Sequence, residues 1–188
     1  MRYLPNGKQM SEADAHTIHE IGIPSLVLME RAALQIVETM HKKNISIEKS
    51  LIVCGSGNNG GDGFAVARLL TEQGKHADVL FAGKEASLSE ECRCQKQIVE
   101  NMGISVFTEF PDEEYTVIID AVFGVGLCRE ITGHYKDVID WMNLQDAEKV
   151  AVDIPSGICA TTGKILGTAF RADLTVCICL LYTSPSPR

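Results

Sequence analysis

The sequence predicts an α/β protein, a three-layer αβα sandwich around a Rossmann-like, mostly parallel sheet with an N-terminal helical extension. Short apolar runs alternate with amphipathic segments over most of the chain, which is typical of parallel strands covered by helices. The apolar runs are nearly continuous, which indicates strands buried on both faces. No internal repeat or linker divides the 188 residues, so we expect one domain.

Two helices are expected before the first strand. Ser11 offers an N-cap, and acidic residues follow it in the first turn. Pro24 then interrupts the chain, and Ser25 can cap a second helix, LVLMERAALQIVETMHKK. This segment has apolar residues at helical spacing and ends in lysines, as amphipathic helices often do.

The remaining elements follow in alternation. Strands are expected at 51–55, 77–83, 104–107, 116–123, 149–155 and 172–178. Helices are expected at 64–72, 87–102 and 135–144. Gly74 and Gly103 follow the first two of these helices, at positions where glycine commonly ends a helix.

The last ten residues do not continue this pattern. The segment CLLYTSPSPR resembles the translated read-through of a transposase-type sequencing adapter. We therefore expect a non-native tail at 179–188 and a domain over 1–178 that is incomplete at its C-terminal end. A disordered natural tail is the alternative.

Composition excludes several classes of function. The formal net charge is −8, whereas nucleic acids and anionic membranes require a basic face. No apolar run approaches the roughly 20 residues of a membrane span. Most of the seven cysteines lie in apolar runs, including Cys54, Cys128 and Cys177. This usage predicts reduced, buried thiols and a cytoplasmic location.

A glycine-rich loop follows the first expected strand. Gly55-x-Gly57-x-x-Gly60 satisfies the dinucleotide fingerprint between a strand and a helix. The second strand, however, ends without the acid that usually holds a ribose. Asp62 is expected where the helix N-terminus would face a pyrophosphate, and a carboxylate there would repel phosphate. It could instead accept hydrogen bonds from hydroxyl or amide groups, or simply cap a tight turn.

Two further carboxylates end expected strands. Asp120 precedes a glycine turn and Asp153 precedes Pro-Ser-Gly, so both should reach the edge where parallel strands place their ligands. Either aspartate alone could be a helix cap or loop anchor. Together with the first loop, Asn59, Asp120 and Ser156 offer hard oxygen ligands for a monovalent cation. Asp153 would then act as acid or base, because no histidine lies in these loops.

Three motifs resemble the signature segments of the NAD(P)HX epimerases, the YjeF N-terminal domain family. They are GSGNNGGDGFAVAR (55–68), DAVFGVGLCR (120–129) and AVDIPSG (151–157). The early segment LMERAA also resembles a family helix, with Ala33 in place of the usual glycine. The resemblance runs from about Gln9 to Val176.

The resemblance implies an isomerase that interconverts the R and S forms of hydrated NADH and NADPH at nicotinamide C6. This is a metabolite-repair reaction, and a dehydratase then restores the S form. The family binds a potassium ion, whose ligands here would be Asn59, Asp120 and Ser156. Asp153 is our first candidate for the catalytic proton carrier and Asp62 the second.

Substrate contacts are expected from the glycine-rich loop, from the loop after the fourth strand and from Asp153. These residues are Asn58, Asn59, Gly60, Gly61, Asp62, Gly124, Val125, Gly126, Leu127, Cys128, Arg129, Glu130, Tyr135 and Asp153. Arg129 matches a basic position of the family and could meet a phosphate or a carboxamide. Tyr135 is included by position only.

Two other classes of function stay open. One is a non-catalytic Rossmann-like module that binds a nucleotide or a protein. The other is a conventional NAD(P)-dependent oxidoreductase, which the missing ribose acid disfavours. We expect a small-molecule substrate, and we expect binding neither to nucleic acid nor to a membrane. A homodimer and a fused or separate NAD(P)HX dehydratase are the partnerships left open.

Overall fold

A six-stranded sheet forms the centre of the computed structural model, which describes residues 7–178. The strand order is β3-β2-β1-β4-β5-β6, and every neighbouring pair is parallel. The strands are β1 (Lys49–Cys54), β2 (His76–Phe81), β3 (Val106–Phe107), β4 (Val117–Ala121), β5 (Glu148–Val152) and β6 (Leu174–Val176). The predicted tail at 179–188 lies outside the described residues.

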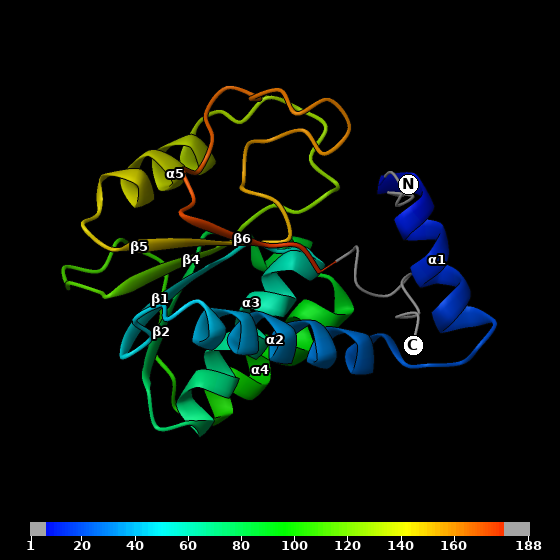
Figure 1. Cartoon of the computed structure of the whole chain (residues 1–188), viewed down its shortest axis with the longest axis horizontal. Coiled ribbons are helices and arrows are strands. Elements are labelled where there is room, and N and C mark those ends of the chain that lie inside the picture. Colours follow the sequence, from blue (N-terminus) through cyan, green and yellow to red (C-terminus); the bar gives the residue numbers. More distant parts are fainter. Residues whose placement is uncertain (1–6, 179–188) are drawn as a thin grey trace.

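Helices cover both faces of the sheet (Figure 1). The first face carries α2 (Ser25–Lys42), α3 (Asn58–Glu72) and α4 (Glu90–Asn101), and the second carries α5 (His134–Leu144). Side chains of a strand alternate between faces, so Ile52 packs in the core on the α3 side and Leu51 in the core on the α5 side. The predicted three-layer αβα architecture is confirmed.

The N-terminal extension is smaller than predicted. Only α1 (Gly7–His19) stands away from the sheet, whereas α2 packs on α3 in the main layer (Figure 1). Both predicted caps were wrong, because α1 begins before Ser11 and α2 begins at Ser25 itself. Pro24 takes the N-cap position of α2, since its fixed φ of −57° and its ψ of 139° suit that place. Its carbonyl accepts a hydrogen bond of 2.9 Å from the N–H of Val27.

Helix α3 begins within the glycine-rich segment that was predicted to be a loop. Gly60 and Gly63 lie in its first turns, although glycine is a poor helix former. A Cβ on Gly63 would lie 2.5 Å from Cβ of Ala121 and 2.8 Å from Sγ of Cys54. The glycines therefore let α3 approach β1 and β4 closely, and this packing outweighs their low helix propensity.

The prediction of buried cysteines was partly wrong. Cys54 and Cys92 are buried, but Cys128 and Cys177 are exposed. These two residues lie in the loop after β4 and just beyond β6, outside the helices and strands. All six cysteines of the described chain are free thiols.

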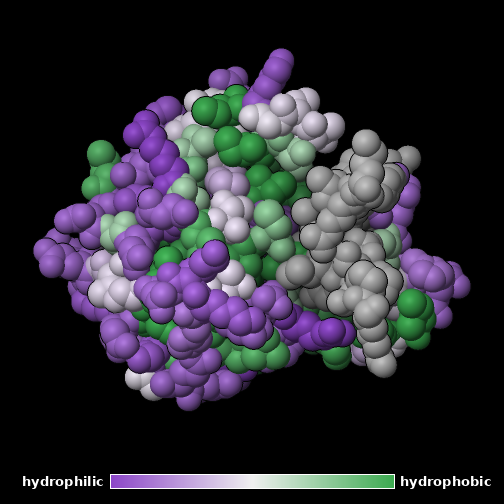
Figure 2. Space-filling model, in the orientation of Figure 1, coloured by the Kyte–Doolittle hydropathy of each residue, from purple (hydrophilic) through white to green (hydrophobic). Residues whose placement is uncertain are grey.

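The surface is uneven in polarity. Hydrophobic residues reach the surface near the centre of the face shown in Figure 2, and hydrophilic residues dominate its left and lower parts. None of the helices within residues 7–178 has the length and apolar character that crossing a bilayer requires.

Candidate active site

A cavity of about 880 Å³ opens at the carboxyl ends of the strands. It lies where the strand order reverses, because the chain proceeds outward from β1 to β2 and β3 and then returns to β4. Open α/β sheets bind ligands at such a switch point. The volume falls within the range of about 300–1,000 Å³ that is usual for small-molecule sites.

Asp120 and Ser156 form a buried pair at the ends of β4 and β5. The Ser156 hydroxyl donates to Oδ1 of Asp120 at 2.6 Å, and its backbone N–H donates to Oδ2 at 2.7 Å. The N–H of Val122 donates to Oδ1 at 3.2 Å, and that of Phe123 donates to the Ser156 hydroxyl oxygen at 2.9 Å. Asp120 therefore holds together the two loops that carry the predicted site.

The carboxyl group of Asp120 is buried without a positive partner. Burial raises its pKa to about 6, although the hydrogen bonds from Ser156 and Val122 act in the opposite direction. No Lys or Arg within residues 7–178 forms an ion pair with it. A bound cation would offset the unfavourable burial of this charge.

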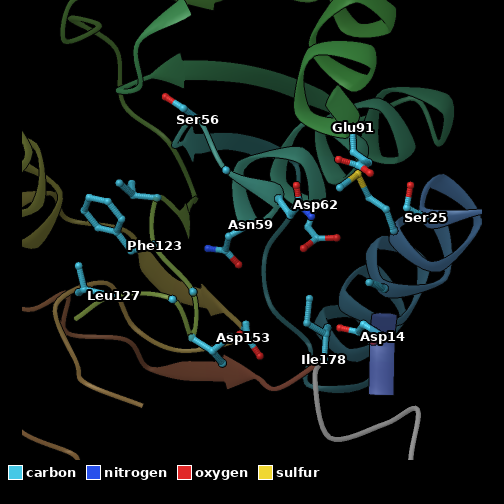
Figure 3. Close-up of a pocket in the computed structure, with 18 of the residues that line it drawn as sticks. Asp14, Ser25, Ser56, Asn59, Asp62, Glu91, Phe123, Leu127, Asp153 and Ile178 are labelled. Carbon is cyan, nitrogen blue, oxygen red and sulfur yellow. The ribbon is translucent and has the colours of Figure 1, made fainter. Parts of the chain in front are cut away.

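Asn59 faces the cavity from the start of α3 (Figure 3). Its Oδ1 lies 3.3 Å from the point where a Cβ on Gly124 would be, and Oδ2 of Asp153 lies 3.2 Å from the same point. The Nδ2 atom is buried and has no hydrogen-bond partner in the described chain. Turning the amide over would place an unpartnered oxygen there. Because a buried polar group without a partner is unfavourable, the position suits a ligand.

Three carboxylates point into the cavity from different parts of the chain (Figure 3). They belong to Asp14 on α1, Asp62 on α3 and Asp153 after β5. Burial, then the charges of Asp153 and Asp14, raise the pKa of Asp62 well above its usual range. Burial, then Asp153, raises the pKa of Asp14. Asp62 and Asp14 can therefore each hold a proton at a higher pH than an isolated carboxylate.

The backbone holds Asp153 in an uncommon conformation. Its φ is +67°, in the left-handed region that few residues other than glycine adopt. Its N–H donates to the carbonyl of Val176 on β6 at 2.8 Å. Such strain typically occurs at functional sites and costs about 1–3 kcal/mol. The sharp turn at the end of β5 brings the carboxylate to the cavity.

Most residues predicted to contact a substrate line this cavity. Those that do are Asn58, Asn59, Asp62, Gly124, Val125, Gly126, Leu127, Cys128, Arg129, Tyr135 and Asp153. Glu130 lies instead on an adjoining cavity of about 260 Å³. Gly60 and Gly61 do not line the cavity, because they pack against Gly55 and Met29.

Two interpretations of Asp62 from the sequence were wrong: the alternative that it caps the turn, and the expected position of its carboxylate at the helix N-terminus. It does not cap α3, since Gly57 occupies the N-cap position and no side chain caps it. Asp62 lies in the second turn, so its carboxylate is not at the helix end where the N–H groups of Asn58 and Asn59 are free. The predicted repulsion of a phosphate at that end therefore no longer applies.

Sequence reasoning missed several residues of the cavity wall. Asp14 comes from α1, and nothing local in the sequence shows that this helix reaches the site. Lys84 and Ser87 follow β2 and line the cavity. In the sequence, this segment was considered only because it lacks the acid that usually binds a ribose. The position just after the second strand was the signal that could have identified them.

One other group has the spacing of metal ligands among the described residues. His76, Asp78 and Glu113 lie at the amino end of the sheet, away from the cavity. Lys49 pairs with Glu113 at 2.7 Å, and the Tyr115 hydroxyl donates to Asp78 at 3.1 Å. Both carboxylates therefore already have partners within the protein.

Comparison with known proteins identifies the family. A model of the family described as "YjeF-related protein N-terminus" matches residues 25–183. The NAD(P)H-hydrate epimerase of Weissella koreensis is 43% identical over 169 residues, which cover 89% of this chain and 76% of that protein. The corresponding protein of Oenococcus oeni is 43% identical over 173 residues, or 91% and 82% of the two chains. That of Limosilactobacillus reuteri is 44% identical over 175 residues, or 92% and 82%.

A solved structure supports the fold. The crystal structure of yeast ynu0 (YNL200c) superposes with a TM-score of 0.81 at 20% identity. The match covers 94% of this chain and 80% of the yeast chain.

Proposed function

The chain belongs to the YjeF-related protein N-terminus family, and we propose that its cavity epimerises hydrated NADH and NADPH. As an isomerase, it interconverts the R and S forms of NAD(P)HX at nicotinamide C6. This conclusion rests on about 43% sequence identity, over about nine-tenths of the chain, to proteins named for that activity. The switch-point cavity and its carboxylates support it.

The cavity offers complementary surroundings for the parts of such a substrate. Phe123 and Leu127 supply apolar wall to the cavity, which suits the reduced nicotinamide ring. The free N–H groups at the start of α3 suit the pyrophosphate, because a helix N-terminus favours anions. Arg129 also lines the cavity and adds a positive charge. We place the hydrated ring beside Asp62 and Asp153.

The chemistry requires one bond to C6 to break and to re-form on the opposite face. The ring nitrogen makes C6 a hemiaminal, so its lone pair assists departure of the hydroxyl or opening of the ring. In the route through departure of the hydroxyl, the bond between C6 and oxygen breaks. Asp62 gives its proton to the hydroxyl, which leaves as water. Water then adds to the other face and gives a proton to a carboxylate. Asp153 remains our first candidate for the group that carries this proton, and the raised pKa of Asp62 suits it as the donor.

We also propose that Asn59, Asp120 and Ser156 hold a potassium ion. The support is the buried Asp120 carboxylate without a positive partner and the unpartnered amide of Asn59. Their oxygen atoms suit a hard cation. When bound, the ion would supply positive charge that stabilises polar groups of the substrate. We propose separately that the protein is cytoplasmic, forms a homodimer and passes its product to a fused or separate NAD(P)HX dehydratase.

Thermal unfolding measures potassium binding directly. Exchanging choline chloride for KCl at equal ionic strength should raise the melting temperature by about 5–10 °C if potassium is at 100 times its Kd. Asp120→Asn should remove most of this shift. Asp146→Asn, at an exposed position outside the cavity, should keep it. Equal shifts in both variants would contradict the assignment.

The activity is tested by mixing the purified chain with R-NADHX and measuring S-NADHX over time. We expect conversion in both directions to the same equilibrium ratio. Binding of NAD(P)HX without conversion would instead favour the nucleotide-binding module.

A further inference from the structure

We propose that the loop after β2 binds the 2′-phosphate of the adenosine ribose, so that the site prefers hydrated NADPH to hydrated NADH. This inference rests on the proposed function, because it extends the same cavity to the other end of the substrate. Lys84 and Ser87 belong to this loop, and both line the cavity. Neither has a role in the reaction at C6.

The topology places this loop where the adenosine should lie. Asp153 follows β5, on one side of the switch point, and β2 lies on the other side of β1. The start of α3 follows β1 and therefore stands between them. With the nicotinamide beside Asp153 and the pyrophosphate at α3, the adenosine extends toward the carboxyl end of β2. Rossmann-like sites read the ribose 2′ position at that strand end.

The loop is fastened to the glycine-rich segment in a defined position. The N–H of Lys84 donates to Oγ of Ser56 at 2.7 Å, and the N–H of Ser89 donates to the Ser56 carbonyl at 2.9 Å. Gly83 permits this approach, since a Cβ there would lie 2.3 Å from Oγ of Ser56. A short 3₁₀ helix, η1 (Glu85–Ser87), follows directly. Lys84 and Ser87 are therefore held at the cavity rim.

The charges of the loop suit a phosphate. Among the charged residues that line the cavity, Lys84 and Arg129 are the cations of the described chain. The Lys84 ammonium forms no ion pair with a described residue. The neighbouring Glu85 is engaged by Lys96 at 2.8 Å. A lysine is a common phosphate ligand, and the free ammonium leaves it available for one.

The end of β2 itself carries no acid. Sites that select NAD place a carboxylate there to bind the ribose 2′-hydroxyl. Here β2 ends at Phe81, and Ala82 and Gly83 follow. Glu91 also lines the cavity, but it lies near Ser25 on the side of α2 and α4, apart from Ser56 (Figure 3). The position that normally rejects a 2′-phosphate therefore lacks its carboxylate.

Two measurements test the inference, one with turnover and one without. The first compares kcat/KM for NADPHX and NADHX in the wild type, Lys84→Gln and Lys84→Arg. We expect Lys84→Gln to lower kcat/KM for NADPHX about 10-fold to 100-fold, as for loss of one charge-assisted contact. The value for NADHX should change less than about 2-fold, and Lys84→Arg should retain most of the preference. Lys43→Gln, at an exposed position outside the cavity, is the matched control.

The second measurement titrates the same variants with 2′,5′-ADP and 5′-AMP by calorimetry. The wild type should bind 2′,5′-ADP about 10-fold to 100-fold more tightly than 5′-AMP. Lys84→Gln should bind the two nucleotides with similar affinity. If neither hydrate is epimerised but Lys84 still selects 2′,5′-ADP, the proposed activity fails and the phosphate site stands. If both hydrates are epimerised and Lys84→Gln affects them equally, the phosphate site is overturned and the activity stands. Equal affinity of the wild type for the two nucleotides would also overturn the phosphate site.

Discussion

The hydroxyl of Ser156 donates a hydrogen bond of 2.6 Å to Oδ1 of Asp120 and so joins the turn after β5 to the end of β4. The same oxygen accepts from the N–H of Phe123 at 2.9 Å. Both side chains are fully buried. One hydroxyl therefore bonds both a buried carboxylate and a backbone N–H of the loop after β4.

Ser156→Ala should lower the free energy of unfolding by about 1–3 kcal/mol, because it removes one hydrogen bond to the buried Asp120 carboxylate and leaves the Phe123 N–H without its partner. Urea denaturation followed by circular dichroism measures the change. Ser105→Ala is the matched control, since Ser105 is exposed and its replacement should alter stability by less than about 0.5 kcal/mol. Equal stability of the two variants would show that the hydroxyl is not required.

Asp153→Asn should abolish epimerisation while leaving substrate affinity nearly unchanged. The amide keeps the shape of the side chain but cannot carry a proton, so we expect kcat to fall about 100-fold or more. Interconversion of R- and S-NADHX gives kcat, and calorimetry with the hydrate gives affinity. Asp146→Asn, exposed and outside the cavity, should behave as the wild type. Near-normal turnover of Asp153→Asn would rule out its role as proton carrier.

Asp62→Asn should stabilise the fold, and the gain should grow with pH. Burial and the charges of Asp153 and Asp14 raise the pKa of Asp62 in the folded state, whereas the unfolded value is about 3.9. Between the two values the folded chain binds more protons, so wild-type stability falls as pH rises through this window.

An asparagine at position 62 does not titrate, so the variant avoids this loss. At pH 8 its melting temperature should exceed that of the wild type by at least about 2–4 °C, the shift that corresponds to about 1 kcal/mol in a chain of this size. The difference should shrink toward pH 4. Parallel pH profiles for the two proteins would mean that folding does not raise the pKa of Asp62.

Gly63→Ala should destabilise the protein, whereas Gly57→Ala should be tolerated. A Cβ at Gly63 would lie 2.5 Å from Cβ of Ala121, but one at Gly57 has no atom within 4 Å. Overpacking of this kind typically costs about 1–3 kcal/mol. Thermal unfolding of both variants distinguishes the positions. A larger loss for Gly57→Ala would contradict the close packing of α3 on β4.

The sequence alone determined the fold class and one edge of the site. Near-continuous apolar runs predicted the strands, because a strand covered on both faces can hold few polar residues. Asp120 and Asp153 were found because residues at the ends of parallel strands meet at the same edge. These inferences need only local pattern and a general rule of topology.

The tertiary structure decided what depends on contacts between distant segments. Close packing on Ala121 and Cys54 makes the glycines the start of α3, although their propensity predicts a loop. The fold also brings Asp14 to the site and fastens Lys84 to Ser56. The raised pKa of Asp62 arises from burial and from two carboxylates that are far away in the sequence. Such effects act through space, so the local pattern of residues does not reveal them.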